Sequence, residues 1–129
     1  MVRFRVISEN TISNVLNYPN PFSTSTQFVY TLTGEPPAEF KIQVATVSGR
    51  IVREITQAEI GELKVGTHRT EYRWNGTDEY GDRLANGVYL YRIAANDSAG
   101  KPYKSYSELE DQGIGRYFAN GWGKMVLLR

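Results

Sequence analysis

Residues 40–47 have the sequence FKIQVATV, in which apolar side chains recur at every second position. A strand points successive side chains to opposite faces of its sheet, so this period indicates a strand with one face on a core. The turn residues Ser48 and Gly49 follow, and residues 50–55, RIVREI, continue as a second strand-like segment. The sequence therefore predicts an antiparallel hairpin over residues 40–55.

The same pattern continues on both sides of this hairpin. Further strands are expected at residues 2–6, 27–32, 68–74, 88–94 and 124–129. The last has a continuous apolar run, which suits a strand buried on both faces. The side chains expected in the core are Phe28, Tyr30, Ile42, Val44, Val88 and Leu90. With turn residues about every ten positions, the chain is predicted to be all-β, an immunoglobulin-like antiparallel β-sandwich of about seven or eight strands.

Two stretches lack a strand period. Residues 56–65 are expected to form a long loop or an irregular edge. Residues 105–118 are the only stretch suited to a helix, with Ser107 as its N-cap, and the glycines within it keep the helix short. We expect one domain over residues 1–129, in which 1–14 provide a leading strand and a connection.

The composition excludes several classes of protein. Fifteen Lys and Arg against fourteen Asp and Glu give a net charge of +1, so no overall field favours nucleic acid. There is no cysteine, which excludes a disulfide, a thiolate metal site and a cysteine nucleophile within these residues. No apolar run approaches the roughly twenty residues of a membrane span, so no transmembrane segment is expected.

Candidate catalytic and metal-binding residues are few. His68 is the only histidine, which excludes a two-histidine metal motif and favours a structural role over that of a general base. Asn75, Asp78, Glu79 and Asp82 could supply oxygen ligands to calcium or cap their own turns, and turn chemistry is the preferred interpretation. No glycine loop of phosphate-binding form is present. We therefore expect no catalytic residue, no cofactor and no required metal.

Three blocks go beyond a generic sandwich pattern: residues 17–22 (NYPNPF), residues 74–91 (WNGTDEYGDRLANGVYLY) and residues 123–129 (GKMVLLR). Occurring in this order, they resemble the C-terminal domains of type IX secretion proteins over residues 15–129. The tryptophan-containing version is similar to the domain on the sortase of that system, a gingipain-like cysteine protease whose catalytic part would lie upstream. The first two blocks also resemble the immunoglobulin-like domain of flagellar hook-capping proteins.

Each block has a physical interpretation. Pro19 and Pro21, on either side of Asn20, remove two amide donors, so their segment should be an edge or a crossing between sheets, with Phe22 closing one end of the core. In the second block Trp74 should point inward. The remaining motif residues of that block, several of them glycines suited to turns with positive φ, are Gly76, Gly81, Asn86, Gly87 and Tyr89.

The resemblance implies a non-catalytic sorting domain that directs export across the outer membrane and retention at the cell surface. Its partner would be the type IX secretion machinery at that membrane. The residues that carry the signal would be Lys124, Met125, Val126, Leu127, Leu128 and Arg129. The hook-capping resemblance implies an alternative, an assembly or ligand-binding module that needs no free C-terminus. The stretch from Ala95 to Trp122 is longer than such domains usually have.

Overall fold

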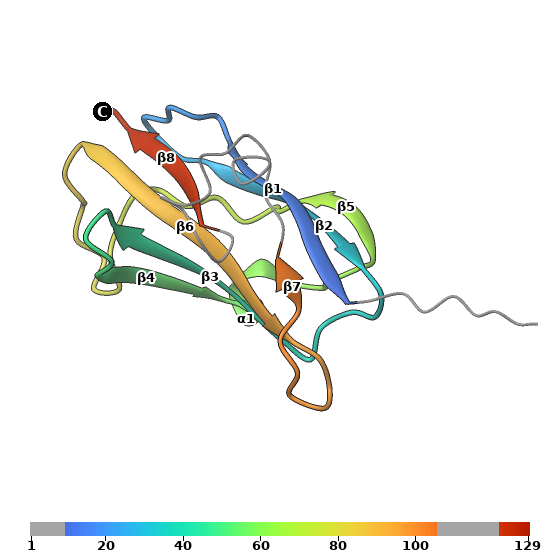
Figure 1. Cartoon of the computed structure of the whole chain (residues 1–129). Helices are drawn as coiled ribbons and strands as arrows, with labels where there is room; N and C mark the ends of the chain where they lie inside the picture. Colours follow the sequence, from blue (N-terminus) through green and yellow to red (C-terminus); the bar gives the residue numbers. More distant parts are fainter. Residues whose placement is uncertain (1–9, 106–121) are drawn as a thin grey trace, which may run out of the picture.

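Two β-sheets packed face to face form the part of the chain that the structure describes, residues 10–105 and 122–129 (Figure 1). The structure is a computed structural model. The elements are β1 (Thr11–Tyr18), β2 (Gln27–Thr33), β3 (Glu39–Thr46), β4 (Ile51–Thr56), α1 (Gln57–Ile60), β5 (Gly66–Arg69), β6 (Gly87–Asn96), β7 (Lys104–Ser105) and β8 (Gly123–Leu127). The chain therefore forms the all-β sandwich that its sequence predicts.

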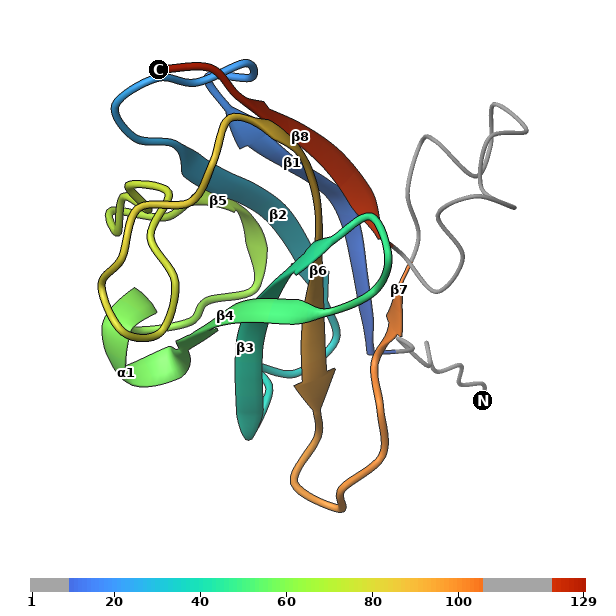
Figure 2. The same cartoon turned by 90° about the vertical axis from the view of Figure 1, so that its left-hand side faces the viewer.

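The strand order is β5-β2-β1-β7 in the first sheet and β4-β3-β6-β8 in the second. All neighbours are antiparallel except β1 and the two-residue β7, which are parallel. The predicted hairpin is present as β3 and β4, joined by a turn in which the amide of Gly49 donates to the carbonyl of Thr46 (2.9 Å). Figure 2 shows the C-terminus beside the loop that joins β1 to β2.

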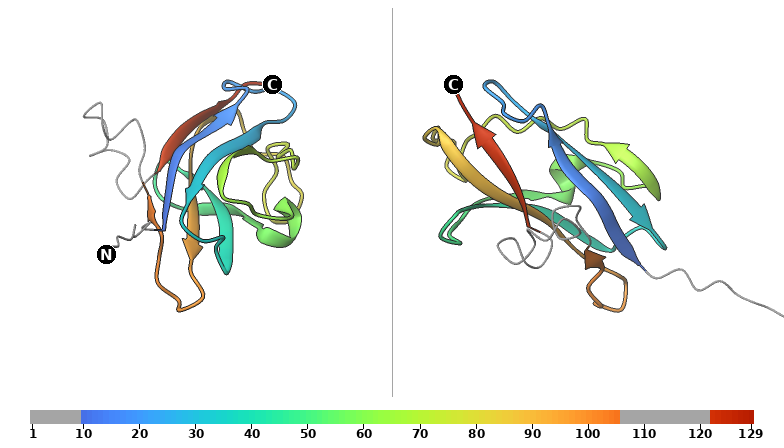
Figure 3. Two further views of the ribbon diagram at one scale, coloured as in Figure 1. Left: turned by 90° about the vertical axis from the view of Figure 1, so that its right-hand side faces the viewer. Right: turned by 45° about the horizontal axis from the view of Figure 1, so that its top comes forward.

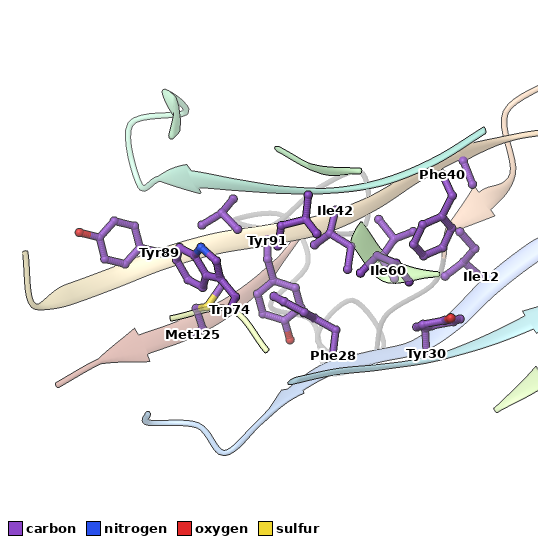
Figure 4. Close-up of a cluster of buried hydrophobic side chains, with 14 of the residues drawn as sticks. Ile12, Phe28, Tyr30, Phe40, Ile42, Ile60, Trp74, Tyr89, Tyr91 and Met125 are labelled. Atoms are coloured by element: carbon purple, nitrogen blue, oxygen red, sulfur yellow. The ribbon is translucent and has the colours of Figure 1, made fainter. Parts of the chain in front are cut away.

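The core lies between the sheets and is rich in aromatic rings. Figure 4 shows Trp74, Tyr89 and Met125 at one end of it, with Phe28 and Tyr91 in the middle. Phe28 and Tyr91 meet edge to face with ring centroids 5.8 Å apart. The predicted core residues Phe28, Tyr30, Ile42 and Val44 are all buried.

The prediction was wrong about the face of β6. Val88 is exposed and Leu90 is half-buried, whereas Tyr89, Tyr91 and Ile93 point into the core. Because both sets of alternating side chains are largely apolar, the two-residue period alone does not say which set faces inward.

The strand predicted at residues 68–74 ends at Arg69. At Thr70 the main-chain amide still donates to the carbonyl of Phe28 (2.8 Å), but the Thr70 hydroxyl accepts the amide of Phe28 (3.1 Å) and donates to the carbonyl of Tyr72 (2.9 Å). A side chain thus replaces half of the regular ladder at this position. The chain returns to the first sheet only at Trp74, which forms an isolated bridge with Thr26.

The segment expected to be a loop at 56–65 contains the short helix α1, which is too brief to produce a sequence period. At its start the amide of Thr56 donates to the Oε1 of Glu59 (3.1 Å). The helix predicted within 105–118 and the strand predicted at 2–6 fall almost entirely outside the described residues.

The sequence did not predict β1. Its pairing with β2 is irregular between Ser13 and Leu16, where Asn14 has a φ of 54°. This bulge shifts the inward positions to Ile12, Val15 and Asn17, so the alternation that would identify a strand is interrupted.

Candidate functional site

The C-terminal strand β8 is the candidate site, because the three sequence blocks meet on it. It pairs with β6 from Gly87↔Leu127 to Tyr91↔Gly123 and forms one edge of its sheet. Met125 and Leu127 are fully buried, whereas Leu128 is exposed and Val126 only half-buried. The prediction of burial on both faces was therefore wrong: only one face of β8 belongs to the core.

The first block covers the free edge of β8. The side chain of Asn20 donates to the carbonyl of Lys124 (3.1 Å) and accepts the amide of Val126 (3.0 Å). Next to Asn20, the amide of Phe22 donates to the carbonyl of Val126 (3.0 Å). The carbonyl of Phe22 accepts the amide of Leu128 (2.9 Å). The proline segment thus crosses from the first sheet to the edge of the second, as its two prolines predict; both are preceded by cis peptide bonds.

The second block holds Arg129, two residues after the end of β8. Asn86 uses its whole side-chain amide on the main chain of Arg129, accepting its N–H (2.9 Å) and donating to its oxygen (3.0 Å). The guanidinium of Arg129 donates to the carbonyls of Asn75 (3.1 Å), Gly76 (2.9 Å) and Leu84 (3.2 Å). Figure 3 shows the strand and its end lying against the loops that join β1 to β2 and β5 to β6.

The two blocks also contact each other behind the strand. Trp74 is fully buried, its ring centroid lies 5.7 Å from that of Phe22, and its indole N–H donates to the carbonyl of Thr77 (3.0 Å). As predicted, Phe22 closes this end of the core. The sequence identified these residues but not what they do together, because their contacts join positions between 43 and 106 residues apart.

A close approach explains why glycine stands at position 76. A Cβ there would lie 3.0 Å from the Nη1 of Arg129 and 3.2 Å from the Cδ2 of Leu127, at a φ of +77°. Gly81 also has a positive φ, +86°, but a Cβ there would meet nothing within 4 Å.

We expect Gly76→Ala to destabilise the domain more than Gly81→Ala does. Both changes strain the backbone by about 1–2 kcal/mol, but only the first also pushes Arg129 and Leu127 away, at a further cost of about 1–3 kcal/mol. Urea unfolding of the two variants measures the difference. Equal free energies of unfolding would show that the contact with β8 does not require glycine.

We expect Asn20→Ala and Asn86→Ala to loosen the strand locally. Each removes two hydrogen bonds to the main chain, of β8 for Asn20 and of Arg129 for Asn86, with a net loss of about 1 kcal/mol. Hydrogen exchange should accelerate at the Val126 amide in the first variant and at the Arg129 amide in the second. Asn96→Ala, which removes a side-chain bond to Glu39 (3.0 Å), is the matched control and should leave both amides unchanged.

The start of β8 packs on a tyrosine ring. A Cβ on Gly123 would lie 2.7 Å from the Cζ of Tyr91, so the ring occupies the space that a side chain would need. Burial raises the pKa of Tyr91 to about 12 from 10.0.

This pKa predicts a loss of stability at alkaline pH. Below pH 10 the phenol is protonated in both states and its contribution is fully present; between about 10 and 12 only the unfolded chain releases the proton, so the free energy of unfolding falls. Melting temperatures at pH 9 and 11 test this. Tyr91→Phe should show a smaller fall than the unchanged chain, and an equal fall would contradict the assignment.

The other candidates form local structure. The Oδ1 of Asp78 accepts the amides of Tyr80 and Asp82 (both 2.9 Å), which is turn chemistry, and Glu79 forms an ion pair with Arg53 (3.5 Å). Within residues 10–105 and 122–129, no three His, Cys, Asp or Glu side chains gather as a metal site would require. His68 is half-buried, and its Nε2 lies 3.0 Å from the carbonyl of Val65.

An ion cluster around Arg53 was not predicted. Its guanidinium pairs with Glu59 (2.5 Å) and donates to the hydroxyl of Tyr72 (3.2 Å). The hydrogen bond from Arg53 is the main reason that the pKa of Glu59 is lowered. The cluster connects α1 and β4 to the loop after β5. It lies at β4, the edge of the second sheet opposite β8, and no sequence motif predicts it.

No protein-family model matches the chain, and a search of the curated proteins found no match. Among solved structures, the fold is similar to part of dimeric latent PorU from Porphyromonas gingivalis, with a TM-score of 0.61 and 21% identity. The alignment covers 98% of this chain and 10% of that chain, so the described sandwich corresponds to a small part of that protein. No helix in the described part of the chain is long and apolar enough to cross a membrane. The structural similarity shows that the described part of this chain has the same fold as a segment of PorU.

Proposed function

We propose that this domain is a non-catalytic sorting module of a protein exported across the outer membrane by the type IX secretion system and kept at the cell surface. Residues 124–129 carry the signal, and the sandwich presents them in a defined conformation. The observation that carries the proposal is the convergence of all three sequence blocks on β8. Residues 20–22 bind its edge, and Asn86 with the loop at 75–84 binds its end.

A generic sandwich does not need this arrangement. An edge strand is often shortened or charged. Here β8 and the residues after it are instead hydrogen-bonded to loops from distant parts of the chain, through the side-chain amides of Asn20 and Asn86 and the guanidinium of Arg129. The motifs that resemble type IX domains are the residues that fasten it. The fold shared with a segment of PorU agrees with the same proposal.

A reporter with a secretory signal peptide, fused to this domain in a type IX-competent bacterium, tests the proposal. We expect the reporter at the cell surface, and we expect the reporter fused to an unrelated β-sandwich to remain in the periplasm. Retention of the first fusion in the periplasm, although it is folded there, would overturn the proposal. An assembly module of the hook-capping type would give that result.

The role of β8 is separated from general stability by a matched pair of core variants. Met125→Ala on β8 and Ile42→Ala on β3 each truncate a fully buried side chain. With export normalised to the amount of folded protein, we expect a loss only for Met125→Ala. Equal export of the two would show that export does not depend on the packing of β8 against the core.

A further inference from the structure

The outer face of the second sheet is divided into a polar half and an apolar half. In the polar half, one row of side chains crosses the sheet as a chain of contacts. Glu54 pairs with Lys41 (3.3 Å) and accepts from Gln43 (2.7 Å), and the Oε1 of Gln43 accepts from Arg92 (2.8 Å). Arg92 in turn lies over the ring of Trp122, 4.6 Å from its centroid. Each of these groups has a partner within the domain.

Towards the end of the sheet where β8 finishes, the next rows are apolar. The register places Ala45 beside Ile51 on one side and Leu90 on the other, and Val88 beside Val126. Val47 and Leu128 follow directly after β3 and β8. We call Val47, Ile51, Val88, Leu90, Val126 and Leu128 the apolar stripe. Four of them are exposed, two by more than half: Val47 67%, Leu128 54%, Ile51 41% and Val88 40%.

An antiparallel sheet with one face on a core normally turns polar side chains to water on the other. Single exposed apolar residues are ordinary, but a set that joins β4, β6 and β8 with the residues directly after β3 and β8 marks an interaction surface. The stripe includes Val126, an outward side chain of β8 itself, and Leu128, the residue directly after β8. It therefore lies on the same strand that the proposed function singles out.

The edge of the sheet at β8 has few free main-chain groups for a partner along this stretch. The edge-facing amides of Val126 and Leu128 and the edge-facing carbonyls of Lys124 and Val126 already bind residues 20–22. Strand addition at this edge would first have to displace that loop. In the folded domain, a partner would have to recognise side chains on the outer face.

The charges beside the stripe indicate the chemistry of the partner. Arg50 precedes Ile51, and Lys124 lies beside Leu90 across the β6–β8 pairing; both are exposed and both are cations. The nearest carboxylate in the adjacent row, Glu54, is already bonded to Lys41 and Gln43. Carboxylates at the margin of a partner would complement these two cations.

We propose that the apolar stripe is the surface by which the folded domain is recognised during sorting, and that its occupant is a partner protein with an apolar surface bordered by carboxylates. This inference rests on the proposed function. It adds that recognition is by side chains on the outer face of an intact sheet, from Ile51 across to Leu128.

The reporter fusion described above provides the test. The variant Val88→Thr with Val126→Thr changes the stripe with nearly isosteric, strand-compatible side chains. The matched control is Val29→Thr with Val65→Thr, which makes the same changes at two partly or largely exposed positions away from the stripe. We expect at least a tenfold loss of surface reporter for the stripe variant, an unchanged melting temperature, and normal export of the control.

The charges are tested in the same assay. Arg50→Glu with Lys124→Glu should also reduce surface reporter about tenfold, whereas Lys64→Glu, an exposed lysine elsewhere, should not. If the unchanged fusion reaches the surface and the stripe and charge variants do so equally well, this inference is wrong and the proposed function stands. If the unchanged fusion is not exported, both are wrong.

Two other occupants are distinguished with the purified chain. We expect it to sediment as a monomer and not to bind vesicles of anionic phospholipid. A dimer that the stripe variant converts to a monomer would identify a second copy as the occupant, and vesicle binding lost in that variant would identify a membrane. Either result would overturn the assignment to a partner protein.

Discussion

Removal of residues 124–129 is expected to leave the domain largely unfolded at room temperature, so that no cooperative unfolding transition is observed. The deletion takes away the fully buried Met125 and Leu127, each worth roughly 1.5–3 kcal/mol. It also removes one of the two strands that pair with β6, leaving only β3, and leaves the carbonyls that bind Arg129 without their donor. Together these losses approach the 5–15 kcal/mol that keeps a typical domain folded.

The measurement is thermal and urea unfolding of the shortened chain beside two single variants. Met125→Ala should cost about 2–5 kcal/mol, because it leaves a cavity in the core. Leu128→Ala, on the exposed face three residues further along, should cost less than about 1 kcal/mol. A shortened chain that melts within a degree or two of the intact one would show that β8 is not part of the core.

Trp74→Ala is expected to be the most damaging single substitution outside β8, with a loss of about 3–5 kcal/mol. Trp74 is fully buried, packs against Phe22 and donates its indole N–H to Thr77, so its removal opens a cavity between the two blocks that hold β8. Residues 20–22 should then lose their support, and the amides of Val126 and Leu128 should exchange faster.

The chain has its own control for this substitution, since its only other tryptophan is Trp122. That ring is half-buried on the outer face of β6, where it stacks with Arg92. Trp122→Ala should therefore cost no more than about 1 kcal/mol. Urea denaturation followed by circular dichroism compares the two, and similar losses would contradict the assignment of Trp74 as the central core residue.

These expectations concern a site that sequence reasoning located only in part. The blocks at 17–22, 74–91 and 123–129 were recognised. Pro19 and Pro21 predicted either an edge or a crossing between sheets, and the structure has the crossing; this much was predictable because a missing amide acts locally whatever the surroundings. The functions of Asn20 and Asn86 were not predictable. An asparagine suits a turn as well as a strand edge, and the partners of these two, Val126 and Arg129, lie more than forty residues away in both cases.

The sequence by itself therefore determined the local features of this protein. These are the alternation that makes β2, β3 and β4 strands, the turn at Gly49 and the glycines that accept positive φ. Packing settled the rest. Both faces of β6 and β8 carry apolar side chains, so the choice of Tyr89, Tyr91, Met125 and Leu127 for the core depends on how the two sheets meet. That choice leaves Val88, Val126 and Leu128 outside, because a strand directs alternate side chains to opposite faces and only one face of this sheet is covered by the other.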